Sequence, residues 1–411
     1  MSKNYRSTKA ACYTGYVTQA IVVNLAPLLF VTFQDTYRFS LSFIAAITLL
    51  TFAVQIGVDL LSIRFVEKTS YRSLCVSSQA ASAAGLVMLA LLPRLLPAHI
   101  AVMLSVIVYS TGSGLAEVVL SPLIDALPQP EDARGASMAL MHSFYSWGQA
   151  FVILVTTAAL RICGGGLWFL LPLFWALIPI YNSIAFLRVP MIRMTVHDGA
   201  HGVGRMLRDP GFILAFFLMI FSGASEQVMA QWASLFAERG LGISKIVGDL
   251  LGPCMFAVMM GLVRTGYGVL GRGRSLYRML FSCSLITIVC YGMTVFSPFP
   301  FLSLIACGVT GLGVGILWPG MLALCAETYP GAGASMFALL ALGGDIGCSL
   351  GPWLCGTVSD AVERLPASAA LAARLSLDAE QVALRTGILA GMIFPILMVA
   401  CLCLLSKKKR S

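Results

Sequence analysis

The sequence predicts an all-α, polytopic membrane protein with twelve transmembrane helices in two pseudo-symmetric six-helix bundles. Of its 411 residues, 58% are apolar and 11% are charged, whereas a soluble domain carries about 25% charged residues. Apolar segments of about 20 residues, the length of a membrane-spanning helix, recur along the whole chain, and short motifs repeat between its halves. This composition excludes a soluble enzyme and a disordered chain.

Twelve apolar segments are separated by short connections that contain Gly, Pro or charged residues. Each is expected to be a helix, because an isolated strand cannot satisfy its backbone polar groups in lipid. They lie at 11–34, 39–62, 73–93, 99–127, 135–160, 166–188, 211–237, 244–269, 276–297, 300–326, 333–357 and 384–405. The basic connection 189–210 divides the spans into bundles 1–188 and 211–411. The connection 358–383 is expected to form an Ala-rich amphipathic surface helix.

An internal repeat predicts that the two halves are related. Gly135-Ala-Ser-Met opens the fifth span, and Gly333-Ala-Ser-Met opens the eleventh. A Gly-x-Gly pair followed by a proline occurs in both the fourth and the tenth spans, starting at Gly112 and Gly313. A Tyr-Arg pair follows the second span and again the eighth. Because each motif recurs in the corresponding helix, we expect two six-helix halves of common origin.

The distribution of positive charge predicts the orientation in the membrane. Eighteen of the 27 Lys and Arg residues fall on the side that holds both termini, and eight fall on the other side. Cytoplasmic loops carry the excess of Lys and Arg, so both termini are expected in the cytoplasm, with the protein in the plasma membrane. The run 407–410 is expected to anchor the chain at that face. The remaining charge is scattered, which argues against nucleic-acid binding, and the polar residues 1–10 predict no signal peptide.

No pattern in the sequence predicts a cofactor, a resident metal ion or an enzyme active site. The twelve Cys residues lie mostly in apolar segments and form no Cys-x-x-Cys pair, so they are interpreted as small packing residues. His197 and His201 have the spacing of a zinc pair, but three nearby glycines favour a loop. A phosphate-binding loop of the Walker type is also missing from the sequence, which argues against ATP as the energy source.

Two related six-helix halves with a basic central connection resemble the major facilitator superfamily. The loop 63–72 after the second span retains Glu67, Lys68 and Arg72 of that family's charged signature, although both of its glycines are replaced. The resemblance implies a secondary transporter that works by alternating access. Asp59, Arg64, Lys68 and Arg72 are the predicted gating residues, with a structural ion pair and a transport role both left open for Asp59.

Glu117 is the main candidate for proton coupling, because an ionisable group deep in a span is costly and needs a reason. Its surroundings, 112–122, follow the pattern G-x-G-x-x-E-x-x-x-S-P and resemble the fucose and related sugar–proton symporter branch. In that branch the glutamate couples proton to sugar. Desolvation favours the neutral form of such a carboxyl group. A buried structural hydrogen bond is the alternative, and His142 is the second candidate for coupling.

Further polar and aromatic side chains within the spans are candidates for solute binding. His142, Tyr145, Ser146 and Gln149 recur at helical spacing on one face of the fifth span. Such a stripe lines a cavity or joins helices. The predicted substrate-binding residues are Gln19, Asn24, Tyr145, Trp147, Gln149, Glu226, Gln227, Trp232, Trp318 and Asp345.

These observations together predict a monomeric secondary transporter that moves a small polar solute, a sugar or polyol, together with protons. The partners expected are the solute, protons and the lipid bilayer. Two alternatives stay open: an exporter of amphipathic compounds, and a transporter-fold sensor that binds solute without moving it.

Cysteine substitutions at Ser2 and Ser411 are expected to stay unlabelled when intact cells meet an impermeant thiol reagent, after native thiols are blocked. A substitution at Ala370, in the connection 358–383, is expected to label readily because it faces the outside. Labelling of either terminus from outside would contradict the orientation that the charges predict.

Overall fold

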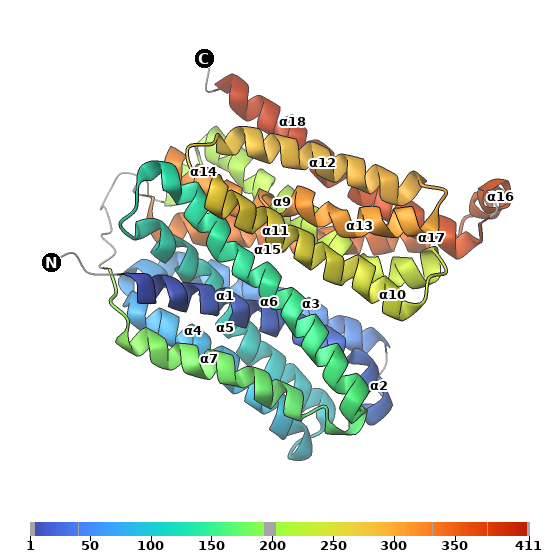
Figure 1. Ribbon diagram of the computed structural model, residues 1–411, viewed down its shortest axis with the longest axis horizontal. Helices are drawn as coiled ribbons and strands as arrows, with labels where there is room; N and C mark the ends of the chain where they lie inside the picture. Colours follow the sequence, from blue (N-terminus) through green and yellow to red (C-terminus); the bar gives the residue numbers. More distant parts are fainter. Residues whose placement is uncertain (1–4, 40, 193–202, 331, 376, 409–411) are drawn as a thin grey trace. The chain divides into compact units, whose positions relative to one another are not determined.

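The computed structural model describes residues 5–39, 41–192, 203–330, 332–375 and 377–408, and within them the fold is almost entirely helical, without strands. Internal contacts divide the chain into two units (Figure 1). The first unit comprises Met1–Val203 and Ala326–Leu342, and the second comprises Gly204–Cys325 and Gly343–Ser411. The predicted bundle boundaries at residues 188 and 211 stay a prediction.

The first unit contains the predicted first six spans. Its helices are α1 (Arg6–Leu28), α2 (Phe30–Tyr37), α3 (Leu41–Phe65), α4 (Tyr71–Leu91), α5 (Ala98–Ala126), α6 (Arg134–Cys163) and α7 (Leu170–Arg188). α4 packs against α5 and α7, and α1 packs against α6 (Figure 1). The beginning of α15 also belongs to this unit, where the hydroxyl of Ser335 donates to the carbonyl of Ile63 on α3 at 3.4 Å.

The second unit contains the predicted last six spans, and several of them are interrupted. Its helices are α9 (Pro210–Leu235), α10 (Lys245–Asp249), α11 (Met255–Leu270), α12 (Leu276–Phe296), α13 (Pro300–Val314), α14 (Leu317–Thr328), α15 (Gly333–Glu363), α16 (Pro366–Leu375), α17 (Ala379–Gly391) and α18 (Ile393–Lys408); the four-residue α8 (Val203–Met206) precedes them. Asp209 caps α9 by accepting from the amide of Gly211 at 2.9 Å. The surface helix expected within 358–383 is α16, shortened because α15 extends to Glu363.

Within the described residues, eleven helical stretches are long and apolar enough to cross a membrane. The span predicted at 11–34 is not among them, because it is less apolar and is broken at Leu29, just after Pro27. Pro27 lies within the last turn of α1 and removes the backbone donor that would meet the carbonyl of Val23. The spans at 300–326 and 384–405 each contain a short irregularity, at Gly315–Ile316 and at Met392, within one apolar stretch. The helical membrane fold is confirmed, and the spans predicted at 300–326 and 384–405 are found within the stretches Pro300–Thr328 and Ala379–Leu405.

The repeated glycines do the same work in both halves. A Cβ atom at Gly112 would collide with Ser78 and Ser82 of α4, and one at Gly313 would collide with Thr287 of α12. Two residues later, Gly114 lies against α3 and Gly315 lies against α11. The Gly-x-Gly motif therefore brings the fourth span close to α3 and α4, and it brings the tenth span close to the equivalent helices α11 and α12. Corresponding glycines of the two halves thus make corresponding contacts, and a common origin of the halves stays a prediction.

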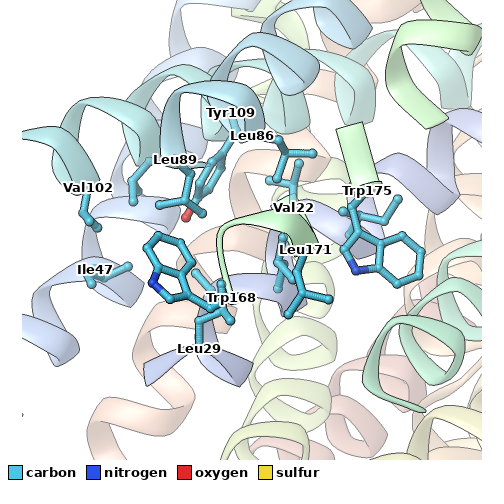
Figure 2. Packing of buried hydrophobic residues seen from close by; sticks show 14 of the residues in the cluster. Val22, Leu29, Ile47, Leu86, Leu89, Val102, Tyr109, Trp168, Leu171 and Trp175 are labelled. Carbon is cyan, nitrogen blue, oxygen red and sulfur yellow. The ribbon is translucent and has the colours of Figure 1, made fainter. Parts of the chain in front are cut away.

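A large apolar cluster fixes the helices of the first unit at the end where α2 joins α3 (Figure 2). Trp168, just before α7, packs edge-on against Phe33 of α2 with ring centroids 5.1 Å apart. Trp175 is fully buried, and its indole N–H donates to Thr156 at 3.0 Å. The other members of this apolar cluster include Val22, Leu29, Ile47, Leu86, Leu89, Val102, Tyr109 and Leu171.

A glycine stripe on α15, which contains Gly347 and Gly351, brings α15 close to α9 in the second unit. A Cβ atom at Gly347 would collide with the carbonyl of Ile220 on α9, and one at Gly351 would lie 2.8 Å from the carbonyl of Ala224. Small residues at this spacing let membrane helices approach each other closely.

Gly347→Ala is expected to lower the melting temperature of the purified protein in detergent, because the added methyl forces α9 and α15 apart. Overpacking of this kind costs about 1–3 kcal/mol. Gly292→Ala in α12 is the matched control: nothing lies within 4 Å of its would-be Cβ. It is expected to be neutral or stabilising by up to about 1 kcal/mol, since Ala is the better helix former. Equal melting temperatures for the two variants would contradict this account of the packing.

Candidate functional site

Two hydrogen-bonded rungs join α1 to α5 inside the first unit. The side-chain amide of Gln19 donates to Oε2 of Glu117 at 2.7 Å. The hydroxyls of Tyr16 and Ser121 lie 2.8 Å apart. The two α1 residues are three positions apart and the two α5 residues are four apart, so each pair lies on one face of its helix. The rungs therefore stack along the α1–α5 contact.

His142 of α6 completes the arrangement. Its Nε2 lies 3.1 Å from the Tyr16 hydroxyl and 3.5 Å from the Ser121 hydroxyl, and its ring centroid lies 4.5 Å from that of Tyr16. All five side chains are buried. We refer to Tyr16, Gln19, Glu117, Ser121 and His142 as the first-unit polar cluster. Both predicted coupling residues lie in it. Tyr16 and Ser121 are not among the predicted site residues, although Tyr16 lies at helical spacing from Gln19, which could have signalled its role.

The other candidate residues of the first unit follow the cluster residues along α1 and α6. Gln149 is buried on α6, and its carbonyl oxygen has no hydrogen-bond partner within the described part of the chain. Asn24 donates to the carbonyl of Ala20 in its own helix at 2.8 Å. Trp147 is 37% exposed. It directly follows Ser146 of the polar stripe, so the two side chains point about 100° apart around the axis of α6.

The second unit contains a buried ion pair that joins α9 to α11. Nη2 of Arg264 lies 3.1 Å from Oε2 of Glu226. Nε of Arg264 donates to the carbonyl of Gly315 at 2.7 Å. That carbonyl is at the break between α13 and α14, and its usual helical partner would be the amide of residue 319. Pro319 has no N–H, so Arg264 supplies the missing donor. Glu226 is a predicted site residue, whereas Arg264 is a site residue that the sequence analysis missed.

The remaining candidates of the second unit lie along α9, α14 and α15. The ring of Trp318 on α14 packs against Gly344, next to the buried Asp345 of α15. Trp232 of α9 packs beside Gly356 of α15, and its indole N–H is buried without a hydrogen-bond partner among the described residues. Gln227 is half-buried beside Glu226. Their roles in substrate binding stay predictions.

The four predicted gating residues are placed differently from one another. Asp59 is buried on α3, whereas Arg64 and Lys68 are exposed. Arg72, at the start of α4, donates to the carbonyls of Phe186, Leu187 and Val189 at 2.5–2.9 Å. These carbonyls end α7 and have few helical partners of their own. Arg72 therefore caps α7, and a role of these residues in gating stays a prediction. The predicted loop histidines, His197 and His201, lie outside the described residues.

The fold and the buried polar groups define a polytopic membrane protein of the transporter class. The family model described as Major Facilitator Superfamily matches residues 12–352, and the chain belongs to this superfamily. It is an integral membrane transporter, as the sequence predicted. No curated protein sequence matches the chain.

Solved transporters of known structure share the fold at low sequence identity. The E. coli fucose:proton symporter is 15% identical, with a TM-score of 0.73, over 96% of this chain and 99% of the symporter. A proton:xylose symporter is 12% identical, with a TM-score of 0.77, over 95% and 94%. A bacterial homologue of the iron transporter ferroportin is 11% identical, with a TM-score of 0.70, over 97% and 99%.

Tyr16→Phe is expected to destabilise the purified protein, because its hydroxyl serves both Ser121 and His142. Loss of one hydrogen bond costs about 0.5–1.5 kcal/mol, and Ser121 and His142 keep their longer 3.5 Å contact with each other within the cluster. Tyr13→Phe on the same helix is the control: the Tyr13 ring stacks on Phe144 at 4.6 Å, and the substitution keeps that stack. Thermal unfolding in detergent measures both. If the Tyr16→Phe protein were as stable as the control, the Tyr16 hydroxyl would not stabilise the cluster.

Proposed function

We propose that this protein is a secondary active transporter that moves a small polar solute, a sugar or polyol, with protons across the plasma membrane by alternating access. The observation that carries the proposal is the first-unit polar cluster, where a buried glutamate and a buried histidine belong to adjacent hydrogen-bonded rungs. A membrane-buried ionisable group is a functional candidate by default. The transporter is proposed to work as a monomer.

The chemistry of Glu117 suits a group that gains and loses a proton. One of its partners, Gln19, is a neutral amide, which donates to a carboxylate oxygen at 2.7 Å without fixing the charge of the carboxyl group. The amide can keep donating to the same carboxyl group after that group is protonated, so the rung can persist through a proton cycle. Glu117 can therefore gain or lose a proton while its hydrogen bond to α1 is kept.

The cluster also provides a direction for the proton. Glu117 lies nine residues before the end of α5, about 14 Å along the helix axis, and Ser121 lies about 8 Å from the same end. His142 lies eight residues into α6, about 12 Å from its start. The predicted orientation places both of these helix ends at the cytoplasmic face. We propose that Tyr16, Ser121 and His142 relay the proton between Glu117 and the cytoplasm.

The sugar or polyol assignment rests on hydrogen-bonding capacity. Gln149 presents a buried carbonyl oxygen that lacks a donor in the described structure, and a solute hydroxyl would satisfy it. Two of the solved transporters with this fold are a fucose:proton symporter and a proton:xylose symporter. The ferroportin homologue has the same fold, so the fold alone does not select the solute, and the argument depends on the side chains.

Glu117→Gln is expected to abolish accumulation of solute against a gradient in proteoliposomes, while exchange of labelled for unlabelled solute survives. The glutamine keeps a carbonyl oxygen for Gln19 but cannot release a proton, and exchange needs no net proton release. Glu380→Gln is the matched control, because Glu380 is exposed and pairs with Arg239 at 3.3 Å. It is expected to accumulate solute as the unmodified protein does.

The same assay separates the rival functions. Accumulation driven by a proton gradient in the Glu117→Gln variant would assign Glu117 to structure. Saturable binding to the unmodified protein without any flux would identify a sensor. Proton-driven efflux of amphipathic compounds, with no response to sugars or polyols, would identify an exporter.

A further inference from the structure

The break between α13 and α14 requires a hydrogen-bond donor, but it does not require the ion pair between Arg264 and Glu226. The carbonyl of Gly315 needs one donor because Pro319 cannot supply it, and a neutral amide side chain would be sufficient. A buried ion pair carries a large desolvation cost and can often be replaced by uncharged groups without loss of stability. Two opposite charges inside membrane-spanning helices therefore call for a role beyond support of the backbone.

We propose that Arg264 is an anion-binding residue and that Glu226 is its resting counter-ion, which the carboxylate of a solute displaces. The inference rests on the proposed function and deepens it: the solute is a sugar acid or polyol acid rather than a neutral sugar. A planar guanidinium is the side chain best suited to hold a carboxylate by two parallel hydrogen bonds.

The geometry around Arg264 permits such an exchange. Its Nε is held by the Gly315 carbonyl, so the guanidinium keeps its place when the contact at Nη2 is broken. The pair joins two different helices, α9 and α11, so Glu226 can withdraw without moving Arg264. The Glu226 side chain is 14% exposed and that of Arg264 is 3% exposed. The counter-ion is therefore the more accessible member of the pair.

Charge balance then links the solute to a proton. When the solute carboxylate replaces Glu226 on Arg264, the displaced carboxylate would be buried without a partner. A proton from the aqueous side neutralises it as Glu226–COO⁻ becomes Glu226–COOH, so one anion and one proton bind together. Other ionisable side chains on helices packed against α9 include Asp249 on α10, bonded to Ser234, Asp345 on α15, and Arg385 on α17, which donates to carbonyls at the end of α12. The same helices also carry Lys245, Asp360, Glu363, Glu380 and Lys407.

The test compares solutes that differ only in the charged group. Calorimetric binding to the purified protein is measured for D-gluconate against D-glucitol, D-glucuronate against D-glucose, and D-galacturonate against D-galactose, with lactate and pyruvate as carboxylates that lack a sugar frame. At least one acid is expected to bind about 10- to 100-fold more tightly than its neutral partner, the range of a charge-assisted hydrogen bond.

Three variants assign that preference to the pair. Glu226→Gln removes the competing carboxylate and is expected to bind the preferred acid more tightly than the unmodified protein. The double variant E226Q/R264Q removes both charges while keeping donors and acceptors, so it is expected to fold and to bind acid and neutral partner alike. Arg239→Gln, an exposed arginine of the same unit, is the matched control and is expected to keep the full preference.

Equal or tighter binding of the neutral partners to the unmodified protein, or a preference that survives in E226Q/R264Q, would overturn the inference. Binding of lactate or pyruvate alone, lost in E226Q/R264Q, would support the anion site and overturn the sugar or polyol assignment. If no carboxylate binds, the inference is wrong, whatever the neutral solutes do.

Discussion

The structure depends on one constraint: inside a membrane, each polar atom must find its partner within the protein. The cost of an unpaired buried group explains why the unusual side chains sit where they do. Gln19 meets Glu117, Arg264 meets the carbonyl that Pro319 leaves without a donor, and Arg72 meets the last carbonyls of α7. Each of these polar groups joins two or more helices, so satisfying the backbone and building the bundles are the same task.

Glycine supplies the complementary constraint. Lipid provides no hydrophobic force that pulls helices together, so close packing and internal hydrogen bonds must do so. Gly112 and Gly313 bring the fourth and tenth spans against their neighbours, and the stripe at Gly347 and Gly351 does so for α9 and α15. The close approach of α5 to its neighbours in turn frames the rung between Gln19 and Glu117. The polar chemistry is thus built on contacts that only a residue without a side chain allows.

The sequence predicted the elements set by composition and period, and missed those set by contact. Twelve apolar segments and a duplicated motif are enough to predict the helices and the correspondence between the two halves, since both depend on local pattern. The breaks at Leu29, Gly315 and Met392 depend on how single residues fit their neighbours, so hydropathy alone did not reveal them. Glu117 and His142 were found because a charge in a span is conspicuous. Arg264 was equally conspicuous, but its meaning depends on a carbonyl 51 residues away.

The bond from Arg264 to Gly315 gives one arginine two separable duties, and the residue at position 319 decides how many of them it must perform. With proline there, the chain needs a donor from another helix to complete its backbone. Any other residue at position 319 would supply its own amide and relieve Arg264 of that duty. If support of the Gly315 carbonyl is the main role of Arg264, the residues at positions 264 and 319 are expected to change together during evolution. A relative that has replaced the proline and kept the arginine would show that the positive charge itself is what selection retains.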